Sequence, residues 1–85
     1  MGGKTLRVTL YSAPGCPHCR QAGEFLRKHG VAFQELNVRA SPKALKQLER
    51  LGTRGVPVIL VGEKRLDGFN GPKLKQMLQA AGIRV

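Results

Sequence analysis

Residues 12–20 of the chain are Ser-Ala-Pro-Gly-Cys-Pro-His-Cys-Arg, and the predicted fold is built around them. The stretch holds both cysteines of the protein, Cys16 and Cys19, with two residues between them. An apolar run precedes the pair and a helical pattern follows it. A Cys-x-x-Cys pair at such a strand-to-helix junction is typical of a thiol–disulfide redox site. A disulfide here would close a loop of only about four residues and would constrain the unfolded chain little, so chemistry explains the pair better than stability does.

The chain has 85 residues, which is enough for a single domain spanning residues 1–85. Its hydrophobic fraction is 41%, and with no Trp, one Tyr and three Phe the core must be mainly aliphatic. Lys and Arg total 15 against 5 Asp and Glu, which gives a net charge of +10. The basic residues are scattered and few aromatic residues accompany them. We therefore expect a solvated basic surface rather than a nucleic-acid interface, and an acidic protein is the best alternative use of the charge.

The N-terminal residues 1–4, Met-Gly-Gly-Lys, are not followed by the long apolar segment of a signal peptide. No apolar run approaches the ~20 residues that a membrane-spanning helix needs. We therefore expect a cytoplasmic protein without a membrane partner. In that reducing compartment the two cysteines would cycle between dithiol and disulfide.

Hydrophobic periodicity predicts an α/β fold with the order β-α-β-α-β-β-α. The predicted elements are a strand at 5–11, a helix at 17–29, a strand at 31–38, a helix at 42–51, strands at 58–61 and 64–66, and a helix at 72–81. Each helix begins with a proline in its first turn and is followed by a glycine. The opening strand–helix–strand unit implies a parallel pair, and the later hairpin adds antiparallel strands. Together they predict a four-stranded mixed sheet flanked by three helices.

The predicted helix N-terminus assigns different roles to the two cysteines. At this position unpaired backbone N–H groups, equivalent to roughly half a positive charge, face the sulfur of Cys16 and favour its thiolate. Cys19 follows one turn deeper on the same face. We expect Cys16 to attack a substrate disulfide and Cys19 to resolve the mixed disulfide. Pro17 stiffens the turn, and His18 tunes the pair by stabilising the thiolate, unless its ring only faces solvent.

A metal site is the competing interpretation of the same residues. Cys16, His18 and Cys19 fall within four positions, so they cannot easily surround one tetrahedral zinc ion. His29 lies at the far end of the same predicted helix, and the chain has no second cysteine pair. We expect no metal and no bound cofactor. A metal-binding module, or an iron–sulfur cluster shared by two chains through Cys16, is the less favoured alternative.

Three motifs together resemble the small glutaredoxin-like redoxins of the thioredoxin superfamily. They are Cys16-Pro17-His18-Cys19, Gly55-Val56-Pro57 and Gly68-Phe69, and the resemblance runs from about Thr5 to Ala81. It implies a thioredoxin-like (glutaredoxin) fold and a dithiol–disulfide oxidoreductase that acts as an electron carrier. We also expect a monomer.

The resemblance extends to a substrate-binding side of the dithiol. It implies that Pro57 follows a cis peptide bond and lies beside the cysteines, and that Val56 pairs through its backbone with the bound substrate. Gly68 and Phe69 belong to a loop that the resemblance places at the same site. Asp67 is the only acidic residue that it brings near the dithiol, as a proton acceptor or an amine contact, and the alternative is a simple turn residue.

Several positions depart from the glutaredoxin pattern. Ala13 replaces a usual Lys or Arg, His18 a usual Tyr and Gly55 a usual Thr, and residues 67–70 replace a Gly-Gly segment followed by acidic residues. In glutaredoxins Ala13, Gly55 and the 67–70 segment correspond to positions that bind glutathione, so these departures weaken the case for glutathione as the reductant.

The Gly68-Phe69 loop resembles that of redoxins which thioredoxin reductase reduces with electrons from NADPH, and which donate electrons to ribonucleotide reductase. The sequence therefore predicts protein disulfides or glutathione mixed disulfides as substrates. Glutathione or thioredoxin reductase would be the electron source, and ribonucleotide reductase would be the target in the second case.

Overall fold

A computed structural model describes residues 7–85 of the chain as seven elements in the order β-α-β-α-β-β-α. Their bounds are β1 Val8–Ser12, α1 Pro17–Lys28, β2 Gln34–Asn37, α2 Pro42–Arg50, β3 Val58–Val61, β4 Lys64–Asp67 and α3 Gly71–Ala80. The beginning of the strand predicted at 5–11, with Thr5 and Leu6, lies outside the described residues. Within residues 7–85, no helix has both the length and the apolar character needed to cross a membrane.

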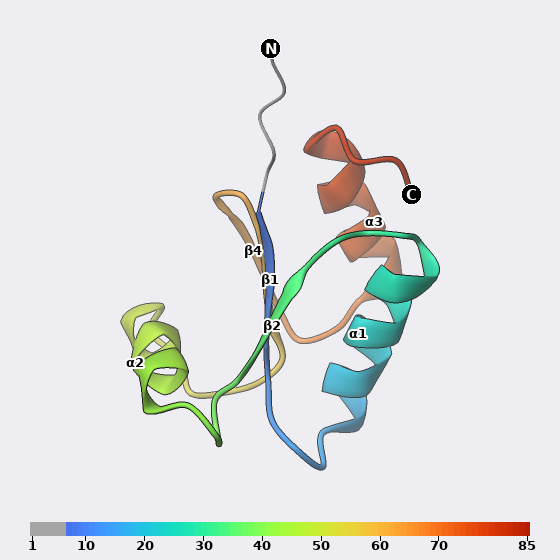
Figure 1. The fold of residues 1–85 in the computed structure, drawn as a ribbon. Helices are drawn as coiled ribbons and strands as arrows, with labels where there is room; N and C mark the ends of the chain where they lie inside the picture. Colours follow the sequence, from blue (N-terminus) through green and yellow to red (C-terminus); the bar gives the residue numbers. More distant parts are fainter. Residues whose placement is uncertain (1–6) are drawn as a thin grey trace.

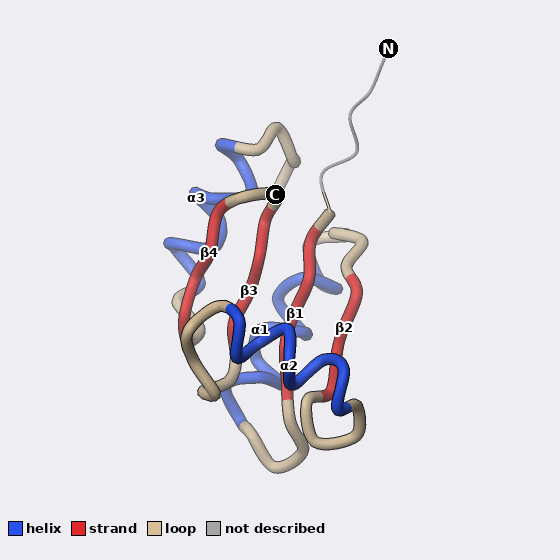
Figure 2. The backbone as a smooth tube through the Cα atoms, turned by 90° about the vertical axis from the view of Figure 1, so that its left-hand side faces the viewer, coloured by secondary structure: helices blue, strands red, loops and turns tan. Residues whose placement is uncertain are grey.

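The strands form one mixed sheet in the order β2-β1-β3-β4. β1 pairs with β2 in parallel, whereas β3 is antiparallel to both β1 and β4. Figure 1 shows the sheet nearly edge-on, with α1 and α3 on one face and α2 on the other, and Figure 2 shows the four strands side by side. This is the predicted thioredoxin-like α/β architecture.

Each helix begins at a side-chain cap followed by a proline in the first turn. Ser41 Oγ accepts the N–H of Ala44 at 3.2 Å, and Asn70 Oδ1 accepts the N–H of Lys73 at 3.1 Å. Such caps satisfy N–H groups that have no partner inside the helix. Because Asn70 is the cap, α3 begins at Gly71, one residue before the predicted start.

β2 is shorter than the strand predicted at 31–38. Val31 is buried, but its N–H donates to the carbonyl of Leu26 at 2.9 Å, so it completes the exit from α1 instead of pairing in the sheet. Val31 is therefore apolar because it is buried in the core, and not because it belongs to a strand. Val38 lies just beyond β2, and its N–H still reaches the carbonyl of Ser12 at 2.9 Å.

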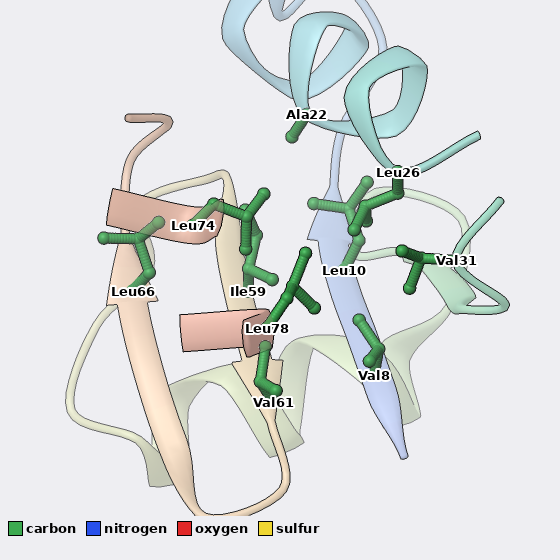
Figure 3. Packing of buried hydrophobic residues seen from close by; sticks show 10 residues of the cluster. All are labelled: Val8, Leu10, Ala22, Leu26, Val31, Ile59, Val61, Leu66, Leu74 and Leu78. Carbon is green, nitrogen blue, oxygen red and sulfur yellow. The ribbon is translucent and has the colours of Figure 1, made fainter. Parts of the chain in front are cut away.

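The core is divided between the two faces of the sheet. The larger cluster packs the sheet against α1 and α3 (Figure 3) and consists of Val8, Leu10, Ala22, Leu26, Val31, Ile59, Val61, Leu66, Leu74 and Leu78. The smaller cluster faces α2 and consists of Tyr11, Val38, Ala44, Leu48 and Val58. Successive residues of β3 alternate between the two clusters, as expected for a strand covered on both faces. The larger cluster therefore fixes α1, the helix that follows Cys16.

Candidate active site

Cys16 is the N-cap residue of α1. Its backbone is extended, and its Sγ accepts the N–H of Cys19 at 3.2 Å. Its side chain is half-buried, so the sulfur is accessible while it receives a backbone hydrogen bond. No acidic residue occurs in the first turn of α1, so no carboxylate of that turn opposes the positive end of the helix dipole.

Cys19 lies one turn later and is buried, with 4% of its surface exposed. Burial, followed by the hydrogen bond with the side chain of Cys16, raises the pKa of Cys19 to about 11. A backbone hydrogen bond from Ala13 acts in the opposite direction, and the charges of Cys16 and Glu35 add to the increase. Cys19 is therefore a protonated thiol at neutral pH, whereas Cys16 is accessible and hydrogen-bonded as an acceptor.

The Val56–Pro57 peptide bond is cis, as the sequence resemblance implied. The antiparallel register pairs Tyr11 with Val58, which places Pro57 beside the end of β1, where the chain turns toward Cys16. Val56 and Ala13 pack against the same apolar cluster. These connections meet at one end of the sheet, at the bottom of Figure 1.

The loop between β4 and α3 lies at the same end of the sheet. The N–H of Gly68 donates to the carbonyl of Pro57 at 2.8 Å. The ring of Phe69 packs edge-to-face on Phe25 of α1, with 5.8 Å between ring centroids. We call the four residues Val56, Pro57, Gly68 and Phe69 the loop side of the dithiol.

The two histidines lie at opposite ends of α1. His18 is exposed in the first turn, next to the cysteines. His29 caps the C-terminal end and packs against Phe25, with 4.4 Å between ring centroids. Within residues 7–85, no group of three His, Cys, Asp or Glu side chains is arranged to hold a metal ion.

Asp67 ends β4, and an arginine on the same strand occupies its carboxylate. Arg65 donates from Nε to one carboxylate oxygen at 2.6 Å and from a terminal nitrogen to the other at 2.8 Å. This pairing holds the pKa of Asp67 below its usual range. Arg65 also donates to the carbonyl of Leu51. The Asp67 carboxylate is therefore committed to Arg65 and is not among the groups that line the cleft of the two cysteines.

A cleft of about 620 Å³ opens beside the dithiol. It is lined by the 13–17 turn, by Cys19 and the outward-facing residues of α1, and by Glu35 of β2. None of the four loop-side residues belongs to it. The hydroxyl of Ser12 donates to Glu35 Oε2 at 2.9 Å. We call Ser12, Cys19 and Glu35 the cleft side of the dithiol.

Sequence reasoning missed Glu35 because the residue lies 23 positions from its partner Ser12. The signal that could have found it is the parallel pairing of the first two strands. Once β2 is placed beside β1, its polar residues fall next to the stretch that leads to Cys16.

Known proteins are similar to this chain in sequence and in structure. The glutaredoxin family model matches residues 8–66. A glutaredoxin of Neisseria meningitidis is 38% identical over 78 residues, which cover 89% of either chain. The glutaredoxin-like protein NrdH of Lactococcus lactis is 30% identical over 70 residues, covering 82% of this chain and 97% of the relative.

Solved structures agree with these sequence matches. The glutaredoxin of Archaeoglobus fulgidus superposes with a TM-score of 0.76 at 30% identity, over 92% of this chain and 99% of the other. The NrdH-redoxin of Escherichia coli, a glutaredoxin-like protein with a thioredoxin-like activity profile, gives a TM-score of 0.75 at 27% identity. That superposition covers 82% of this chain and 92% of the other.

Proposed function

Because the chain belongs to the glutaredoxin family and is a thiol–disulfide oxidoreductase, we propose that Cys16 and Cys19 are its reacting groups. The observation that carries this proposal is the contrast between the two thiols. Cys16 is accessible at the helix N-terminus and accepts a backbone N–H, whereas Cys19 is buried and protonated one turn away. We also propose that residues 1–85 act as one domain.

The reaction proceeds in two exchanges. The Cys16 thiolate attacks one sulfur of a substrate disulfide, a Cys16–substrate disulfide forms, and the other substrate sulfur leaves as a thiolate. Cys19 then attacks the Sγ of Cys16, so the Cys16–Cys19 disulfide forms and the second substrate thiol is released. The protein loses two electrons and the substrate gains them. Pro17 and His18 tune the dithiol from within the first turn of α1.

The loop side binds the substrate next to Cys16. Val56 lies just before β3, whose first residue, Val58, pairs with Tyr11 near the turn that leads to Cys16, so an extended substrate segment can run past the backbone of Val56 and bring a disulfide to Cys16. Gly68 is tied to Pro57 by a hydrogen bond, and Phe69 is held against α1, so the loop presents a fixed surface. The substrates are protein disulfides or glutathione mixed disulfides.

A second candidate concerns the electron source. The NrdH relatives and the Gly68-Phe69 loop favour a redoxin that thioredoxin reductase reduces with NADPH and that passes electrons to ribonucleotide reductase. Arg65 supports this candidate because it occupies the carboxylate of Asp67, which would otherwise be free to receive the amine of glutathione.

A comparison of reductants tests the two candidates. The oxidised protein is offered glutathione with glutathione reductase, or NADPH with thioredoxin reductase, and NADPH consumption is followed with a protein disulfide as the final acceptor. Turnover only with glutathione identifies the first candidate, and direct enzymatic reduction identifies the second. A Cys16→Ser variant is the blank in both assays, and activity equal to wild type in this variant would refute the proposed dithiol.

A further inference from the structure

The face of the sheet that α1 covers is apolar except at its dithiol end. Along β1, Val8, Leu10 and Ser12 point to the same face because side chains alternate along a strand. Val8 and Leu10 belong to the larger core, and Ser12 continues their row as a buried polar residue with 5% exposure. A buried hydroxyl needs a hydrogen-bond partner. Ser12 finds it in Oε2 of Glu35 at 2.9 Å.

Glu35 reaches this face from the edge strand. The parallel register pairs Glu35 with Leu10, so both side chains lie on the α1 side of the sheet. Leu10 enters the core, whereas Glu35 is exposed and lines the cleft that Cys16 and Cys19 also line. The Ser12 hydroxyl therefore holds a carboxylate at the wall of an open cleft that both cysteines line.

The other charged groups of the cleft all come from α1. They are Arg20, Glu24 and Arg27. The guanidinium of Arg27 lies against Gly23 and over the ring of Phe33, 5.8 Å from the ring centroid. Neither ion pair formed within residues 7–85 involves Glu35, so no arginine neutralises its carboxylate.

The second exchange of the proposed mechanism needs a proton acceptor. Cys19 is a buried thiol, and it must lose its proton as its sulfur bonds to the Sγ of Cys16. The negative charge of Glu35 already reaches this sulfur, since it is among the causes that disfavour the Cys19 thiolate. When Glu35 takes up the proton, its own charge disappears as the negative charge develops on Cys19. Glu35 and Cys19 are then never negatively charged at the same time.

We propose that Glu35, positioned by Ser12, accepts the Cys19 proton during resolution by way of a water molecule in the cleft. The proposal rests on the dithiol mechanism above. The Cys16–Cys19 bond forms, the Cys16–substrate bond breaks, the Cys19 proton passes through the water to the carboxylate and then to solvent, and the departing thiolate is protonated by solvent.

A single-turnover experiment separates this proposal from the mechanism on which it rests. Reduced protein is mixed with dithiobis(nitrobenzoate), which releases one coloured thiolate when Cys16 attacks and a second when Cys19 resolves. We expect Glu35→Gln to leave the first phase unchanged. The rate of its second phase should fall by roughly tenfold to a hundredfold at neutral pH. This change is at or below the lower end of the rate factors that general bases contribute. The pH dependence of the second phase should change in this variant, whereas that of the first phase should not.

Two further variants complete the test. Ser12→Ala, which frees the carboxylate without removing it, should slow the second phase less than Glu35→Gln does. Glu24→Gln removes an acid from the same cleft and should change neither phase. A second phase in Glu35→Gln that equals wild type, or is faster because only an electrostatic penalty was lost, overturns the proposal. Loss of the first phase in the wild-type protein would instead refute the dithiol mechanism.

Discussion

The two sides of the dithiol are built in different ways. The loop side depends on backbone geometry, with a cis peptide at Pro57 and a hydrogen bond from Gly68 to the carbonyl before β3. The cleft side depends on side chains that the sheet brings together, since Ser12 and Glu35 come from neighbouring strands. A cis peptide bond or a tight turn needs particular residues at consecutive positions, so it can be recognised as a motif in the sequence. A side-chain pair across strands leaves none, because its partners are set by register.

The largest expected effect comes from removing the thiol of Cys16, which lies between the loop side and the cleft side. Cys16→Ser should reduce disulfide exchange to the uncatalysed background, because no other thiol within residues 7–85 is accessible. Cys19→Ser should still attack but should stop at the mixed disulfide, which mass spectrometry would detect as an adduct on Cys16. A Cys19→Ser protein that turns over protein disulfides like wild type would show that Cys19 does not resolve the mixed disulfide.

The next effect sharpens the contrast between the two thiols. The pKa of about 11 predicts that Cys19 resists alkylation by iodoacetamide until the pH approaches that value, while the more accessible sulfur of Cys16 remains open to the reagent. The folded pKa lies above the usual 9.0, so this burial stabilises the fold below about pH 9, and the contribution is lost as the pH rises toward 11. Peptide mapping after alkylation at a series of pH values measures how much of each cysteine is modified. Equal modification of both cysteines near neutral pH would contradict the assignment.

A smaller effect tests the backbone of the loop side. Gly68 has a φ of +83°, a conformation that costs other residues about 1–2 kcal/mol. Gly68→Ala should therefore lower the free energy of unfolding by about that amount in a urea titration. Gly55→Ala is the matched control, because Gly55 lies in the same region without a positive φ and the added methyl would meet only Thr53 Oγ1 at 3.5 Å. Equal losses in the two variants would argue against a strained turn at Gly68.

The smallest effect concerns the ion pair at the end of β4. Arg65 lowers the folded-state pKa of Asp67, so the pair stabilises the fold above the unfolded pKa of about 4. That contribution is lost as the pH falls through the depressed value. Both residues are solvent-exposed, so the gain is small. Asp67→Asn should be slightly less stable than wild type at neutral pH, and the difference should vanish in strong acid. A difference that persists in acid would assign the effect to something other than the carboxylate charge.

The contrast between the two sides also explains what the sequence could predict. Periodicity and the Pro and Gly signals gave the element order, the helix that follows Cys16 and the mixed sheet. The motifs of the loop side were recognisable as segments of sequence. The bounds of β2 were not predictable because Val31 is apolar for reasons of core packing and not of pairing.

The acidic residue near the dithiol could not be predicted for a related reason. The sequence resemblance pointed to Asp67, which is adjacent to a recognisable loop, but its carboxylate is held by Arg65. Glu35 lies in a strand that carries no motif, and only the parallel register with β1 brings it to the cleft. Contacts of this kind require the three-dimensional pairing to be known.

The hydrogen bond from the Cys19 N–H to the Sγ of Cys16 has a spectroscopic consequence. A thiolate sulfur is a strong acceptor, and a disulfide sulfur is a weak one, so this amide proton experiences a different electronic environment in each redox state. Its nuclear magnetic resonance signal should shift upfield on oxidation. The molecule therefore carries, within its own backbone, a probe of its redox state that needs no label and leaves both sulfurs free to react.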